Sequence, residues 1–125
     1  MNDTKKMEWI LRVGVAGEFI GHGLLAIYGK QDWVGWIARV VHVENSMATT
    51  LLLLIGMLDL IVALIVFIKP VGPVLLWATF CGLGTALLRP IFGLGWLEFF
   101  TRSANWAAPL SLYYVLRENK RIKST

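Results

Sequence analysis

The chain has 125 residues, of which 57% are hydrophobic and 16% are charged, and its mean hydropathy is +0.65. Soluble domains are about 45–50% apolar and about a quarter charged, so this composition excludes an ordinary soluble domain and predicts a single integral membrane domain over 1–125. The formal net charge is +4, but the basic residues gather at helix ends and in the tails, which fits membrane topology and not nucleic-acid binding.

The first apolar segment, 9–28, is long enough to cross a bilayer, because about 20 helical residues match a hydrocarbon core of roughly 30 Å. Arg12, near its start, is expected to extend to the lipid headgroups. Glu18 and His22 lie four residues apart and therefore project from one helical face. Ionisable groups inside a span are costly and usually face a bundle interior or a watery cavity. We therefore expect this face to point toward the other helices.

The next segment, 30–43, is too polar and too short to span. Its apolar residues recur at helical spacing, and they are Trp33, Trp36, Ile37, Val40 and Val41. This pattern predicts a short amphipathic helix that lies in the membrane interface and is anchored there by its two tryptophans. The segment is either a lid over the bundle or a plain connector.

Three further spans are predicted at 46–68, 74–89 and 96–116. Asp59 lies inside the second span, the third ends at Arg89 before a proline, and the fourth contains Pro109, which membrane helices tolerate. The predicted fold class is therefore all-α, as a four-transmembrane-helix bundle with a short interfacial amphipathic helix between the first two spans.

Four spans place both termini on one side of the membrane. Most basic residues then fall on that side, namely Lys5, Lys6, Lys69, Arg117, Lys120, Arg121 and Lys123. Because positive charge is retained on the cytoplasmic side, we expect a multi-pass protein with both termini in the cytoplasm.

Each span carries one stripe of polar or small residues, and the predicted ligand-binding residues come from these stripes. They are Glu18, His22, Asp59, Arg89, Glu98, Arg102, Asn105 and Trp106. The six ionisable members are expected to line a single cavity that opens toward the outer face. Structural roles are the alternative for some of them: an i, i+4 salt bridge between Glu98 and Arg102, a headgroup contact for Arg89, and packing for His22.

Other chemistries fit the sequence less well. A metal site needs a cluster of ligands, and His22 with His42 and one acid are too few, so no metal is expected. Haem ligation by the same two histidines is not expected either, because His42 lies at the interface.

The first half of the chain resembles the DoxX-like family of small four-helix membrane proteins. The resemblance rests on Arg12, Phe19, His22-Gly23 and Tyr28-Gly29, followed by Glu44, the leucine run 51–54 and Gly56. It implies a bacterial or archaeal inner-membrane protein. Some relatives are membrane subunits of thiosulfate:quinone oxidoreductases, and others belong to membrane redox-stress complexes.

This resemblance implies an inner-membrane component of a quinone-linked redox system, with a quinone-like or other small ligand in the polar pocket. Glu18 and His22 would provide a proton path, Arg102 or Asn105 would bind a carbonyl, and the slot would be walled by Trp77, Trp96 and Trp106. No redox centre is visible, so electron transfer would need a redox partner protein or a bound cofactor. Two alternatives stay open: a small-solute or proton pathway protein, expected as a homo-oligomer, and a non-catalytic assembly or anchoring subunit of a membrane complex. Whether the chain is an enzyme is also open.

Overall fold

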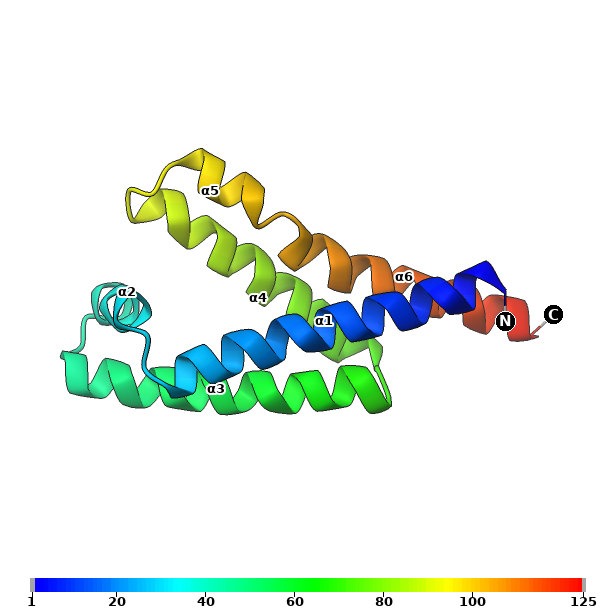
Figure 1. The fold of residues 1–125 in the computed structure, drawn as a ribbon, viewed down its shortest axis with the longest axis horizontal. Coiled ribbons are helices and arrows are strands. Elements are labelled where there is room, and N and C mark those ends of the chain that lie inside the picture. Colours follow the sequence, from blue (N-terminus) through cyan, green and yellow to red (C-terminus); the bar gives the residue numbers. More distant parts are fainter. Residues whose placement is uncertain (1, 125) are drawn as a thin grey trace.

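The computed structural model describes residues 2–124, and within this range every element is a helix. The helices are α1 (Asp3–Ile27), α2 (Gln31–Val41), α3 (Asn45–Ile68), α4 (Gly72–Ile91), α5 (Trp96–Thr101) and α6 (Ala104–Ser124). The all-helical prediction is confirmed. Figure 1 shows two arms that diverge toward the end where α2 lies: α1 with α3, and α4 with α5 and α6.

The first arm depends on a close crossing of α1 and α3. A Cβ atom added at Gly23 would lie 2.9 Å from the carbonyl oxygen of Gly56, and one added at Gly56 would lie 2.7 Å from the carbonyl oxygen of Gly23. No real side chain fits at such distances, so the two glycines allow the backbones to touch. Small residues are the usual means of close packing between membrane helices.

The second arm has a comparable contact between α4 and α6. Pro109 has no N–H to donate to the carbonyl group of Asn105 four residues earlier, so this carbonyl is free. It faces Gly82, where an added Cβ atom would collide with it. Gly82 therefore lets α6 lie directly against α4.

The two arms meet at the end that holds both termini. α6 packs against α1, and an apolar core joins four helices there. Its buried members are Val15, Ala16, Phe19, Val62, Ala63, Val66, Leu75, Ala78 and Leu112. Asn119 of α6 donates to the carboxylate of Glu8 at 2.9 Å, so the two ends of the chain lie side by side, as Figure 1 also shows.

A buried ion pair strengthens the same end. Arg12 is 7% exposed and donates to Glu8 at 3.0 Å, and its other terminal nitrogen donates to the backbone carbonyls of Phe67 and Ile68 at the end of α3. The expectation that Arg12 extends to the headgroups is therefore wrong. Free carbonyls at a helix end attract a cation, and this attraction holds the guanidinium inside the bundle.

Three helices are long and apolar enough to cross a membrane, namely α1, α3 and α4. Large apolar side chains cover their outer surfaces, for example Ile10 at 69%, Leu64 at 59% and Phe80 at 70% exposure. Such a surface suits a lipid bilayer better than water.

The predicted single helix over 96–116 is wrong, because the chain breaks at Arg102 and Ser103 into α5 and α6. The hydroxyl groups of Thr101 and Ser103 donate to the carbonyls of Glu98 and Phe100, and such bonds compete with helical backbone pairing. Two other helix ends differ from their predicted positions. α1 begins at Asp3 because the Asn2 side chain accepts from the backbone N–H of Lys5, and α4 runs through Pro90 to Ile91.

α2 occupies the open end between the arms. Its buried residue Val34 packs against Ala26 of α1 and against Ala48 and Leu52 of α3. α2 lies within the segment 30–43 for which a helix is predicted, and its Trp33 and Trp36 are partly buried and line a cavity, as the next section describes.

Candidate ligand-binding site

A cavity of about 210 Å³ lies between the two arms, below α2. Its walls come from α1, α2, α3 and α4, and most of the lining is apolar. The apolar and weakly polar lining residues are Phe19, Ala26, Trp33, Trp36, Ile37, Val40, Val41, Leu52, Ile55, Cys81, Gly82, Thr85 and Leu88.

Packing closes the cavity above and below. The small cluster around Val34 forms the roof beneath α2. Phe19 belongs both to the cavity lining and to the large apolar core, so this core forms the floor. The cavity therefore does not continue toward the end that holds the termini.

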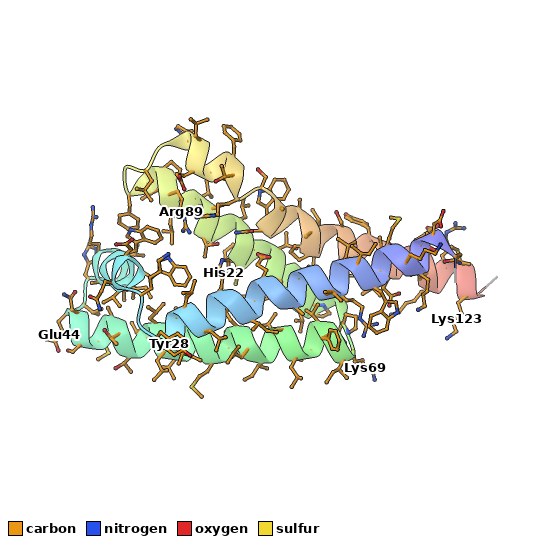
Figure 2. The ribbon with its side chains drawn as sticks, viewed as in Figure 1. His22, Tyr28, Glu44, Lys69, Arg89 and Lys123 are labelled. Atoms are coloured by element: carbon orange, nitrogen blue, oxygen red, sulfur yellow. The ribbon has the colours of Figure 1, made fainter. Side chains whose placement is uncertain are left out.

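Four ionisable side chains line this cavity: Glu18 and His22 from α1, Asp59 from α3 and Arg89 from α4. Glu18 and Asp59 lie next to the floor, because Phe19 follows Glu18 directly and Val62 lies one turn beyond Asp59. Figure 2 shows His22 and Arg89 in the half of the molecule near α2, far from Lys69 and Lys123. The site thus has an acidic inner end and a basic outer end.

These four groups have few partners in the protein. Within residues 2–124, none of the four forms an ion pair, and their one hydrogen bond runs from Arg89 to the backbone carbonyl of Thr85 at 3.2 Å. Glu18 and Asp59 are close enough to interact electrostatically. Polar groups in a protein interior normally have hydrogen-bond partners, so this cluster has capacity for a ligand or for water.

Aromatic and cationic side chains stack at the outer end. Trp36 of α2 lies parallel to Phe92, which follows α4, with ring centroids 5.7 Å apart. Arg89 lies 4.8 Å from the centre of the Trp36 ring, and Arg39 lies 4.5 Å from the centre of the Phe92 ring. This stack, which we call the Trp36–Phe92 clasp, joins α2 to the end of α4 beside the cavity.

The other four predicted site residues do not line the cavity. Glu98 and Arg102 form a half-exposed i, i+4 pair at 3.9 Å, which matches the structural alternative for them. Arg102 is still close enough to act on His22 by its charge. Asn105 and Trp106 lie where α6 packs against Gly82.

The aromatic wall also differs from the expectation. Trp77 and Trp96 are 45% and 62% exposed, and neither lines the cavity, whose tryptophans are Trp33 and Trp36. Helical spacing predicts that these two tryptophans share a face, and this face lines the cavity. Cys81 and Thr85, one turn apart on α4, also line the cavity, although neither is among the predicted ligand-binding residues.

Metal and haem sites have no support in the residues described. No group of three or more histidine, cysteine, aspartate or glutamate side chains in residues 2–124 could hold a metal ion. His42 ends α2 in a left-handed conformation with φ of 59° and lies outside the cavity, so it does not face His22 across a shared pocket.

Comparisons of the chain with protein-family models, with curated proteins and with solved structures find no match. The cavity geometry therefore carries the functional argument.

Proposed function

We propose that this chain is a multi-pass inner-membrane protein that binds a small quinone-like ligand in the cavity beneath α2, as the membrane component of a quinone-linked redox system. The observation that carries the proposal is the convergence of Glu18, His22, Asp59 and Arg89 on one apolar-walled cavity in which none of them is ion-paired. Ligand pockets typically combine apolar walls with a few convergent polar groups.

The size of the cavity limits the ligand. Pockets for drug-sized molecules hold about 300–1,000 Å³, and this cavity of about 210 Å³ is smaller. It suits a single ring headgroup, with any apolar tail lying in the opening between the arms. Trp33 and Trp36 would provide flat surfaces against such a ring.

The resemblance to the DoxX-like family suggests the same chemistry, since some of its members are quinone-linked. The residues available are those a quinone site needs: Arg89 to bind a carbonyl oxygen, and His22 and Glu18 to exchange protons with it. Electrons would come from a partner protein or another cofactor, because the described residues form no redox centre of their own.

The topology we propose has four passes, with α2 near the outer interface and both termini in the cytoplasm. Three helices meet the criteria for a span, and α6 lies along α1 and α4 with its apolar half. The bond between Asn119 and Glu8 supports placing both termini on one side. Eight of the twelve basic residues, counting Arg12, lie at that end, which favours a cytoplasmic location.

The floor of the cavity favours binding over passage. A solute or proton pathway would need polar groups beyond Glu18 and Asp59, but the next layer is the apolar core that contains Phe19, Val62 and Leu75. The pathway alternative is therefore the weaker one.

A titration tests the proposal. A short-chain benzoquinone added to the purified protein in detergent should quench tryptophan fluorescence and raise the melting temperature in a saturable manner. Thr85→Phe places a ring in the cavity and should abolish both effects, whereas Leu83→Phe places the same ring on the outer, partly exposed surface of α4 and should preserve them. Equal binding by the two variants, or none by the natural protein, would overturn the proposal.

A further inference from the structure

We propose that the cavity holds its ligand in one orientation, with an oxygen acceptor at Arg89 and a hydroxyl donor at Glu18 and Asp59. The preferred ligand is then a hydroxylated aromatic ring, which for a quinone-linked protein is the reduced quinol and not the quinone. This inference rests on the proposed function and specifies the form of its ligand.

The outer end of the cavity carries N–H donors that have no hydrogen-bond acceptor in the part of the chain that the structure describes. Arg89 is only 6% exposed, and its guanidinium, which has five N–H groups, makes one hydrogen bond, to the carbonyl of Thr85. The indole N–H of Trp33 is fully buried and has no acceptor within the described residues. Buried donors without acceptors are costly, so a ligand that brings an oxygen atom to this end is stabilised.

The inner end of the cavity carries carboxyl oxygens that accept no hydrogen bond from the described residues. Glu18 and Asp59 accept no hydrogen bond from any residue in 2–124, and no cation pairs with them. A carboxyl group retains an acceptor oxygen whether or not it is protonated. A ligand hydroxyl can therefore donate to this end in either protonation state.

The two ends are close enough for one ring to reach both. Because Arg89 bonds to the carbonyl of Thr85, its guanidinium lies one helical turn nearer the floor than its own backbone. Arg89, Glu18 and Asp59 all line the same cavity of about 210 Å³, so a single ring placed in this cavity lies near all three side chains.

The two redox forms of such a ring differ in their fit. A quinone has acceptors at both oxygens, so it satisfies Arg89, but when Glu18 and Asp59 are both ionised it sets a carbonyl oxygen against their acceptor oxygens. A quinol carries an O–H at each oxygen, so it accepts from Arg89 and donates to the carboxyl groups. A hydrogen bond to a charged group typically changes affinity by on the order of tenfold or more.

Anaerobic equilibrium dialysis tests this inference. The purified protein is dialysed separately against a short-chain benzoquinone and against its quinol, at a pH that keeps Glu18 and Asp59 ionised, and each form is quantified by chromatography. We expect the quinol to bind on the order of tenfold more tightly. In the double variant Glu18→Met/Asp59→Leu, which keeps volume and removes the acceptors, we expect this preference to disappear while quinone binding persists.

Two variants serve as controls. Glu118→Met removes an acid of α6 that pairs with Arg121 and does not line the cavity, and it should leave both affinities unchanged. Arg89→Met removes the donor from which both forms accept a hydrogen bond and should weaken the binding of both forms. Melting curves verify that each variant is folded.

The outcomes separate the inference from the function on which it rests. If neither form binds the natural protein, the proposed function fails. If both forms bind with equal affinity, if the quinone binds more tightly, or if the quinol preference survives the double variant, the proposed function stands and the orientation is wrong.

Discussion

Removing the carboxylate of Glu8 should destabilise the bundle more than any exposed substitution. Glu8 is 3% exposed and joins three elements: Arg12 on its own helix at 3.0 Å, Asn119 of α6 at 2.9 Å, and, through Arg12, the last carbonyls of α3. The substitution Glu8→Leu leaves the Arg12 guanidinium buried without its counter-ion.

The magnitude follows from what remains around Arg12. Breaking a buried ion pair costs about 3–5 kcal/mol, because one charge is left uncompensated. Arg12 keeps its bonds to the carbonyls of Phe67 and Ile68 and its position 3.9 Å from the centre of the Trp9 ring, so we expect the lower end, about 3 kcal/mol. For a chain of this length that corresponds to a fall in melting temperature of roughly 10 °C.

A double-mutant cycle in detergent measures this coupling by circular dichroism. Arg12→Met should cost about 2–3 kcal/mol, because Glu8 is left with Asn119 and the half-exposed Lys5. The double variant leaves no unpaired charge at this position and should cost less than either single change. Single variants that melt within about 2 °C of the natural protein, or strictly additive effects, would refute the reasoning.

Three further predictions concern other parts of the fold. A cysteine that replaces Gln31 should react with an impermeant reagent added outside intact cells, whereas one that replaces Lys5 should not; labelling at the terminus would contradict the proposed orientation. Gly82→Leu should lower the melting temperature by several degrees because α6 lies against it, whereas Gly84→Leu, where a side chain meets open space, should not. Trp36→Ser should disrupt the Trp36–Phe92 clasp and increase proteolysis within 30–43, and unchanged digestion would show that the clasp does not hold α2.

Periodicity and hydropathy in the sequence predicted most of the helices. The predicted spans agree with both ends of α3 and α4 within two residues and with the end of α1 within one, whereas α1 begins six residues earlier than predicted. Long apolar segments leave few alternatives to a helix. The prediction passes over the break between α5 and α6 because Glu98, Arg102 and Asn105 keep the spacing of a polar stripe on one continuous helix. The break depends on hydroxyl groups that bond locally to the backbone at Thr101 and Ser103, which hydropathy does not register.

The candidate site was predicted in part. The i, i+4 spacing of Glu18 and His22 and the depth of Asp59 placed these residues on faces that do converge on the cavity. Glu98 and Arg102 keep similar spacing, but α5 turns away from the cavity, and helix periodicity alone does not reveal such a turn.

Trp33 and Trp36 illustrate a second limit of sequence reasoning. An amphipathic helix shows which residues share an apolar face, but the sequence does not show whether this face meets lipid or protein. Here the two arms diverge, and α2 packs into the opening with its tryptophans directed toward the cavity.

Native mass spectrometry of gently extracted protein tests the central claim most directly, because it detects small molecules that remain bound from the cell. We expect the natural protein to retain a small molecule with the mass of a quinone or its quinol, Leu83→Phe to retain it as well, and Thr85→Phe to lose it. Natural protein that is free of any such molecule after extraction with its lipids, or equal retention by the two variants, would contradict the account.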